Sequence, residues 1–510
     1  MRKRLTGIAS TPNKATQHGI PRLSLGWLAL LLYSLSTAQA AATTDDPVAL
    51  QARITRVEQG LSPRVVVKGA PRPAMTLQAR MAYHHVPAVS IALIDHGQVQ
   101  WARAYGVADA NSGQAATPAT LFQAASISKT VAAVAALRMV EQGQLALDRP
   151  ANDDLTHWKI PDNAFTAQQP VTLRMLLNHS AGINVHGFDG YAQGQPLPSL
   201  LQELDGRPPS NVEPMRVDTV PGTVWRYSGG GYSVVEQLMA DVGGQPYAAL
   251  AQRLVLDPLG MSGSTFATTL PPGALARAAT AHDSNGQALP GRWNVYPESA
   301  AAGLWATPTD LAQLVLAVQR ADAGAPDAVL SPATARLLLT RGLGEYSLGL
   351  FVEPLGDRTS FGHSGGNHGF RSQLYGYTRS GQGIVVMTNS DNGAALIEEL
   401  LTSVATEYDW PEYRVVEKTA LPHDARSNAA LAGAYTLAGK PAHVIADGAD
   451  LYFQSELFGS ARMALYRASP DHYFMTAQDM GLLVQRDARG QVNGFSLQRN
   501  GATYPATRNR

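Results

Sequence analysis

The sequence predicts an α/β fold in which helices flank an antiparallel sheet and add a helical subdomain, followed by a small C-terminal β-barrel or sandwich. Three observations predict it. Strand-like segments stand near both ends of residues 41–408, the stretch between them is mostly helix and loop, and residues 428–510 are short strands separated by turns. Early and late strands can share one sheet only if the middle of the region forms a helical layer or subdomain.

The early strands are expected to form a β-hairpin. Residues 89–94 and 99–103 have strand character and flank the turn sequence Asp95-His96-Gly97-Gln98. A helix is expected over residues 130–143, because Ala, Val, Leu and Met recur there at helical spacing and glycine ends the segment. Late strands are expected at residues 347–352, 370–377 and 383–388.

Two further segments organise the chain. Residues 187–221 are rich in Gly and Pro with little periodicity, and we expect a loop there that shapes a substrate pocket. Residues 409–427 carry prolines and mixed charge and are expected to be a linker. The all-β domain beyond it, residues 428–510, has seven expected strands at residues 434–438, 442–446, 451–455, 462–466, 472–476, 482–486 and 494–499.

The first forty residues predict a secretory signal peptide, residues 1–40. They carry five basic and no acidic side chains, an apolar run of eleven residues at 25–35, and the small-x-small sequence Ala38-Gln39-Ala40. That run is shorter than the roughly 20 residues that a membrane-spanning helix needs, so no stable membrane span is expected after cleavage. The chain has no cysteine, which excludes disulfides and a thiol nucleophile. We therefore expect a bacterial periplasmic or secreted protein.

The charge composition indicates which kinds of partner the protein can bind. The chain has 40 basic and 40 acidic residues, whereas a nucleic-acid-binding protein usually carries a basic surplus on one face. No nucleic-acid partner is therefore expected. The expected partner is a small-molecule or peptide substrate, and the sequence leaves the oligomeric state open.

The run Ser126-Ile127-Ser128-Lys129 stands at the start of the predicted helix. Residues three apart on one helical turn face the same side, so the Ser126 hydroxyl and the Lys129 amine can approach each other. A serine hydroxyl needs a base to become a nucleophile, and burial near the positive end of a helix favours the neutral amine of a lysine. This pair alone occurs by chance in chains of this size, so other residues must support it.

Two later segments supply that support. Tyr227-Ser228-Gly229 stands in a Gly-rich stretch, and a tyrosine near a lysine can relay or donate a proton. Phe361-Gly362-His363-Ser364-Gly365-Gly366 lies in the late strand region, where a Gly-rich strand edge can offer an N–H group to an oxyanion.

This ordered set resembles the signature of the serine β-lactamase and penicillin-binding protein superfamily, which reads Ser-x-x-Lys, Tyr-x-Asn and Lys/His-x-Gly. The resemblance covers roughly residues 75–409, includes residues 172–182 and 303–307, and is closest to the class C β-lactamases and their esterase and D-aminopeptidase relatives. It implies a β-lactamase/transpeptidase-like fold. It also implies that Ser126 is the acylated nucleophile, that Lys129 and Tyr227 transfer protons, and that His363 replaces a lysine. The N–H groups of Ser126 and Gly366 would then form the oxyanion hole.

Two positions depart from the family pattern. Gly229 stands where the family has Asn, which removes an amide that holds the lysine and the substrate carbonyl. His363 can be neutral where a lysine is charged, so its attraction for a substrate carboxylate is weaker. Both departures indicate a peptidase- or esterase-like relative more than a dedicated β-lactamase.

A rival interpretation makes Ser364 the nucleophile. Gly362-His363-Ser364-Gly365-Gly366 matches the Gly-x-Ser-x-Gly elbow of α/β-hydrolases, with Asp391 and His423 in the right order as partners. That elbow requires a helix directly after the serine, whereas residues 370–377 have strand character.

Neither a metal nor a cofactor is expected. The pair His84-His85 and the pair of His363 with His368 lack metal-ligand spacing, and a structural role is expected for His179. The sequence thus predicts an exported serine hydrolase that cleaves amide, peptide, ester or β-lactam bonds through an acyl-enzyme, with peptides that begin or end in D-residues among its candidate substrates. The alternative is a penicillin-binding or sensor protein that is acylated without turnover.

Overall fold

The computed structural model describes residues 46–71, 75–422, 424–458, 462–477, 479–499 and 502–509. The predicted signal peptide, residues 1–40, lies outside these ranges, and so does His423. Among the described residues, no helix is both long and apolar enough to cross a bilayer.

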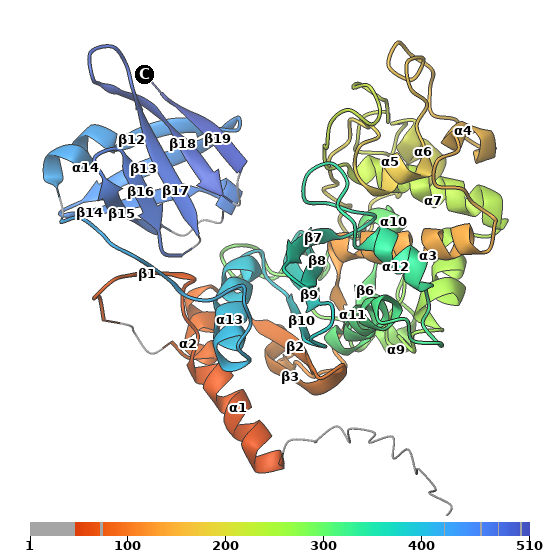
Figure 1. Ribbon diagram of the computed structural model, residues 1–510, viewed down its shortest axis with the longest axis horizontal. Coiled ribbons are helices and arrows are strands. Elements are labelled where there is room, and N and C mark those ends of the chain that lie inside the picture. Colours follow the sequence, from red (N-terminus) through yellow and green to blue (C-terminus); the bar gives the residue numbers. More distant parts are fainter. Residues whose placement is uncertain are drawn as a thin grey trace, which may run out of the picture. The chain divides into compact units, whose positions relative to one another are not determined.

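An antiparallel sheet organises the first domain and confirms the predicted fold class. The predicted hairpin is present, and early and late strands share the sheet because β2 pairs with β10. The seven strands follow the order β4 (Gln114–Ala115), β3 (Gln98–Asp109), β2 (Ala88–Asp95), β10 (Gly383–Thr388), β9 (Phe370–Tyr377), β8 (Arg358–Asn367) and β7 (Phe351–Leu355) (Figure 1).

Helices cover both faces of this sheet. One face carries α1 (Pro47–Gln59), α2 (Leu77–Tyr83) and α13 (Gly393–Glu407), and the other carries α11 (Pro308–Asp322). Successive side chains of a strand point to opposite faces. Val89, Ile91 and Leu93 of β2 therefore pack with α1 and α13, whereas Ala92 and Ile94 pack on the α11 side. Every residue of β2 is buried, as expected for a strand covered on both faces.

The predicted helical subdomain lies in the chain between the early and late strands. The helix expected over residues 130–143 is α3, which begins two residues earlier than predicted. The helices of this part are α3 (Ser128–Glu141), α4 (Ala151–Asp154), α5 (Leu173–Leu177), α6 (Leu200–Leu204), α7 (Gly229–Gly243), α8 (Tyr247–Ala251), the π-helical turn η2 (Gln252–Leu256), α9 (Pro272–Leu275), α10 (Ser299–Ala302) and α12 (Pro332–Leu338). The predicted pocket loop, residues 187–221, is irregular apart from α6.

The predicted start of the strand at residues 347–352 was wrong. Gly349 has a φ of 91° and lies in a turn that packs on α3, where an added Cβ would come within 2.4 Å of the Ala133 Cβ. The Gly349 carbonyl accepts a hydrogen bond from the Thr130 hydroxyl at 2.9 Å. This close packing on α3 holds residues 347–350 in a turn, and β7 begins at Phe351.

The C-terminal domain is a closed eight-stranded barrel, which decides between the predicted barrel and sandwich. The seven expected strands are present within a few residues of their predicted bounds, and the eighth, β19, was missed. The strands are β12 (Gly433–Leu437), β13 (Lys440–Asp447), β14 (Asp450–Ser455), β15 (Met463–Ser469), β16 (His472–Met475), β17 (Met480–Arg486), β18 (Val492–Arg499) and β19 (Ala502–Arg508), with the 3₁₀ turn η3 (Glu456–Phe458) after β14.

β19 has a weak strand signal because it contains Pro505 and few apolar residues, yet it closes the barrel by pairing with β18 and β12. The barrel interior is filled by side chains such as Tyr435, Phe453 and Phe495. The predicted linker, residues 409–427, is not wholly irregular: β11 (Val416–Lys418) pairs in parallel with β1 (Val65–Val67), and α14 (Ala425–Leu431) crosses the predicted boundary at residue 428.

Candidate active site

Ser126 and Lys129 meet as the sequence predicts. Ser126 lies in the 3₁₀ turn η1 (Ala125–Ile127), directly before α3, and its Oγ is 3.2 Å from the Lys129 Nζ. The Lys129 Nζ also donates a hydrogen bond to the Ala301 carbonyl of α10 at 2.8 Å. Ala125 has a φ of 50°, an uncommon left-handed conformation for a residue with a Cβ. Such conformations concentrate at functional turns.

Burial sets the charge state of Lys129. Its side chain sits in the protein interior, and the residue is only 2% exposed. Burial penalises the ammonium form and lowers the pKa of Lys129 to about 7. Near neutral pH a large fraction of the amine is therefore unprotonated and can accept the proton of the Ser126 hydroxyl.

Tyr227 is the third member of the group. It immediately precedes Ser228, the N-cap of α7, so the start of that helix fixes its position. The Lys129 Nζ lies 5.1 Å from the centroid of the Tyr227 ring. Burial raises the pKa of Tyr227 above its usual range, and a hydrogen bond with Ser126 opposes this rise in part. The phenol therefore keeps its proton at neutral pH and is available as a donor.

His363 lies in β8 and is neutral. Its Nδ1 is 2.6 Å from the Ser364 carbonyl, and its Nε2 is 3.0 Å from the Tyr346 hydroxyl. Because a carbonyl can only accept, Nδ1 carries the proton and Nε2 accepts the hydrogen bond of Tyr346. Burial, followed by the positive charge of Lys129, lowers the pKa of His363 to about 3. His363 therefore offers no positive charge to a substrate carboxylate.

The Gly-rich end of β8 passes next to the nucleophile turn. β7 pairs with β8 only as far as Gly362, and no other strand of the described residues pairs with the following edge of β8 on that side. An added Cβ at Gly365 would lie 2.1 Å from the Ala124 carbonyl oxygen, so glycine is needed for this approach. Gly366, the next residue, is exposed. The structure thus brings Ser126, Lys129, Tyr227, His363 and Gly366 into one site, and their roles stay predictions.

Three further aromatic residues lie near the site: His179, for which a structural role is expected, and Tyr232 and Tyr346, which were missed. The His179 ring centroid lies 4.2 Å from that of Tyr227 and 4.5 Å from that of Tyr346, and its Nδ1 accepts the Ser228 N–H at 3.1 Å. Burial, with the charge of Lys129 as the next cause, lowers the pKa of His179 well below its usual value. The structural role expected for His179 is therefore to pack against Tyr227 and help to hold its ring in place. Tyr232 and Tyr346 complete the cluster, and no sequence motif marks either of them.

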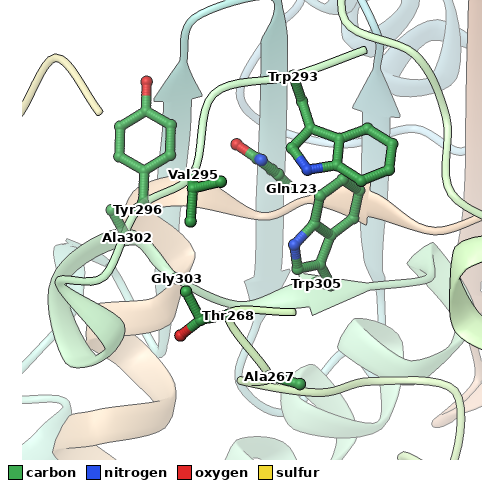
Figure 2. A pocket seen from close by; sticks show the side chains of 9 residues that line it. All are labelled: Gln123, Ala267, Thr268, Trp293, Val295, Tyr296, Ala302, Gly303 and Trp305. Atoms are coloured by element: carbon green, nitrogen blue, oxygen red, sulfur yellow. The ribbon is translucent and has the colours of Figure 1, made fainter. Parts of the chain in front are cut away.

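A small pocket lies beside α10 (Figure 2). Trp293 and Trp305 form one wall with ring centroids 4.9 Å apart. Its volume of about 10 Å³ is room for at most one water molecule, so it is too small for a substrate. The pocket is lined by Gln123, Ala267, Thr268, Trp293, Val295, Tyr296, Ala302, Gly303 and Trp305. Phe188, Gly366 and Asn367 help to line a larger open cavity.

Hydrogen bonds link this small pocket to the site. The Asn367 amide donates to the Gln123 side-chain oxygen at 2.7 Å and to the Ala302 carbonyl at 3.2 Å. Gln123 belongs to β5 (Phe122–Gln123), which pairs with β6 (Trp305–Ala306) and leads into η1. The end of β8, the nucleophile segment and α10 are therefore tied together by one buried amide pair.

The elbow interpretation of Ser364 is wrong. Ser364 lies inside β8 with its side chain exposed, and the next element after β8 is the strand β9. An elbow needs a strand-to-helix turn at the serine, which is absent here. Asp391, its expected partner, instead binds the Arg371 guanidinium at 2.9 Å and the Gly369 N–H at 2.9 Å.

The histidines considered as metal ligands are engaged otherwise. His84 bonds to the Glu399 carboxylate at 3.0 Å beside the guanidinium of Arg80. His368 lies 3.6 Å from Asp391. Over the described ranges, no group of three or more His, Asp or Glu side chains is arranged to hold a metal ion.

The comparison with known families agrees with this geometry. The family model described as Beta-lactamase matches residues 74–405. The chain belongs to the beta-lactamase family. Members of this family are serine hydrolases, and the chain is one of them.

Relatives and solved structures extend the comparison. Esterase EstB of Burkholderia gladioli is 32% identical over 182 residues, which span 34% of this chain and 46%, about half, of EstB's own length. Penicillin-binding protein 4 of Amycolatopsis lactamdurans is 26% identical over 377 residues, 70% of this chain and 94% of that protein. The octameric penicillin-binding protein homologue from Pyrococcus abyssi shares the fold with a TM-score of 0.56 and 21% identity, over 84% of this chain and 98% of that one. D-amino acid amidase from Ochrobactrum anthropi SV3 is also similar in fold, with a TM-score of 0.54 and 20% identity. The match covers 71% of this chain and 99% of the amidase chain.

Proposed function

We propose that this family member is an exported hydrolase that cleaves ester or amide bonds through an acyl-enzyme on Ser126. The observation that carries the proposal is the buried Lys129 amine, with its pKa lowered to about 7, 3.2 Å from the Ser126 Oγ. A base with a pKa near the working pH is well suited to take the proton of a nucleophile. Tyr227, protonated and adjacent, supports the proposal as the proton donor.

The proposed reaction has two halves. As the Ser126 Oγ attacks the carbonyl carbon, its proton passes to the Lys129 Nζ, and the carbonyl electron pair becomes an oxyanion facing the N–H groups of Ser126 and Gly366. Collapse of this intermediate breaks the bond to the leaving oxygen or nitrogen, which takes a proton from Tyr227, and Lys129 reprotonates Tyr227. Water then attacks the acyl-enzyme, gives up a proton to the same pair, and releases the acid and the Ser126 hydroxyl.

The charges around the site favour substrates without a carboxylate beside the scissile bond. His363 is neutral and points to Tyr346. The Arg371 guanidinium near Gly366 is already held by Asp391 and by the carbonyls of Asn367 and Phe370. We therefore favour neutral esters and amides over penicillins, in keeping with the names of two similar proteins, an esterase and a D-amino acid amidase.

The alternative is a sensor that is acylated and does not turn over. Progress curves of product release distinguish this sensor from a hydrolase. The purified protein should release p-nitrophenol from p-nitrophenyl acetate continuously, over many equivalents per site, and should turn over nitrocefin more slowly. A single burst of one equivalent would favour the sensor. Equal rates in the wild type and in Ser126→Ala would contradict both functions.

Export is part of the same proposal and rests on the composition of residues 1–40. Expression of the full chain in a bacterial host should give a protein in the periplasm or medium whose mass begins at Ala41. A cytoplasmic protein that retains its first forty residues would contradict export and leave the chemistry of Ser126 standing.

A further inference from the structure

The space beside Tyr227 is filled from another segment of the chain. Gly229, in the first turn of α7, stands where relatives with the Tyr-x-Asn pattern have a side chain. A Cβ added at Gly229 would lie 2.7 Å from Cε2 of Phe188 and 3.2 Å from the His186 carbonyl oxygen. A separation of 2.7 Å is far below an ordinary carbon–carbon contact of roughly 3.5–4.0 Å. The Phe188 ring therefore takes the room that a side chain at position 229 would need.

The segment before Phe188 is fixed against the start of α7. The Gly229 N–H donates to the His186 carbonyl at 2.8 Å, and the Ser228 hydroxyl donates to the Val185 carbonyl at 2.7 Å. The His186 Nδ1 lies 3.0 Å from the Tyr227 carbonyl, which can only accept. These bonds hold the backbone next to Phe188 along the residues that follow the proposed proton donor.

The segment after Phe188 is fixed on the opposite side of the site. The Asp189 carbonyl accepts hydrogen bonds from the Asn294 amide at 3.2 Å and from the Tyr296 hydroxyl at 3.3 Å. The same Tyr296 hydroxyl accepts the His368 N–H at 2.9 Å, just beyond the end of β8. Phe188 thus stands in a short bridge between the Tyr227 side and the β8 side, anchored at both ends.

The Phe188 ring lies against Gly229, two residues after the proposed proton donor Tyr227, and also borders open space. It is half-buried and helps to line the open cavity that Gly366 and Asn367 also line. The hydrogen bonds on both sides fix the Phe188 backbone, so its segment cannot withdraw from the site without breaking several of them. An acyl group bound between Tyr227 and the end of β8 would meet this ring.

We propose that Phe188 is the specificity-determining residue of this site, and that it restricts the enzyme to narrow, unbranched acyl esters and amides and disfavours bulky or bicyclic acyl donors. This inference rests on the proposed function. A hydrophobic wall discriminates by roughly tenfold or more between acyl groups that differ by a single methyl or methylene group, and acetyl and trimethylacetyl groups differ by three.

The test compares two esters. For Phe188→Ala, the ratio of kcat/KM for p-nitrophenyl trimethylacetate to that for p-nitrophenyl acetate should rise roughly tenfold or more. Phe188→Leu, which keeps an apolar side chain, should give an intermediate ratio and guards against a folding failure of the smaller variant. Leu197→Ala is the matched control, because Leu197 is 37% exposed in the same loop and should leave the ratio unchanged.

A second pair of variants tests the steric contact itself. Gly229→Asn should lose most of its acylation rate because its Cβ collides with Phe188, and the double variant Gly229→Asn/Phe188→Ala should recover it. An unchanged ester ratio in Phe188→Ala, or full activity in Gly229→Asn alone, would overturn the inference. If the wild type does not react with a fluorophosphonate at Ser126, the proposed function itself fails; if it reacts while the ester ratio stays constant, only the role of Phe188 fails.

Discussion

The pH dependence of acylation follows directly from the burial of Lys129. An ordinary lysine, with a pKa of 10.5, has roughly one neutral amine in three thousand at pH 7. At a pKa of about 7 the neutral fraction is about one half, on the order of a thousandfold more. Because the neutral amine is the base, the acylation rate should rise with pH, pass its midpoint near pH 7 and level off above it. At pH 5 the rate should be roughly 1% of the plateau.

The assay is the second-order rate of fluorophosphonate labelling at pH 4.5 to 9, read by intact mass so that product release plays no part. The pKa of His363 is lowered to about 3 and the pKa of Tyr227 is raised, so both groups keep their charge states across this range. Neither should add a second transition to the pH profile of the labelling rate. Lys129→Arg is the matched variant. Its guanidinium keeps the positive charge, cannot deprotonate, and should lower the plateau rate by a factor of roughly a hundred to ten thousand.

Two results would show that Lys129 is not the base. A labelling rate that stays constant between pH 5 and pH 9 would show that no group with a pKa near 7 controls the nucleophile. A Lys129→Arg variant that labels at nearly the wild-type rate would show that another base activates Ser126.

Three further predictions concern the surroundings of the site. Tyr346→Phe leaves the buried Nε2 of His363 without its hydrogen-bond donor. The free energy of unfolding, measured by urea titration, should therefore fall by about 1–3 kcal/mol. A loss below about 0.5 kcal/mol would argue against that hydrogen bond. Ser228→Ala removes the cap that accepts the Gly231 N–H, and it should cost about 1 kcal/mol, visible as a lower Tm; an unchanged Tm would speak against the cap. Burial raises the pKa of Glu236 to about 8, so the unfolded chain releases this proton first and stability should fall as pH rises from 4.5 to 8. Glu236→Gln should reduce that fall in Tm, and an identical pH dependence in both proteins would contradict it.

Local signals predicted much of the fold. The hairpin of β2 and β3 was predictable because strand-like residues flank a turn at His96 and Gly97, and β9 and β10 were found with their observed bounds. The start of β7 was not, because the turn at Gly349 is set by contact with Ala133, which is distant in sequence. β19 was missed for a similar reason, since its pairing with β12 and β18, rather than its own composition, makes it a strand.

Some residues of the candidate site could likewise be predicted from local sequence, and others could not. Ser126 and Lys129 are neighbours in sequence, so their approach within 3.2 Å could be predicted from helix geometry. Tyr227 and Gly366 required the order of motifs and the resemblance to a known family. Phe188 gave no signal, because its position against Gly229 depends on how a long loop is anchored at both ends.

Mapping the site of covalent labelling shows whether Ser126 is the nucleophile. The mature wild-type protein and the variants Ser126→Ala and Ser364→Ala are treated with a fluorophosphonate, digested and analysed by tandem mass spectrometry. We expect one adduct per chain on the peptide containing Ser126, retained in Ser364→Ala and absent in Ser126→Ala. An adduct that persists in Ser126→Ala and disappears in Ser364→Ala would identify Ser364, and not Ser126, as the nucleophile.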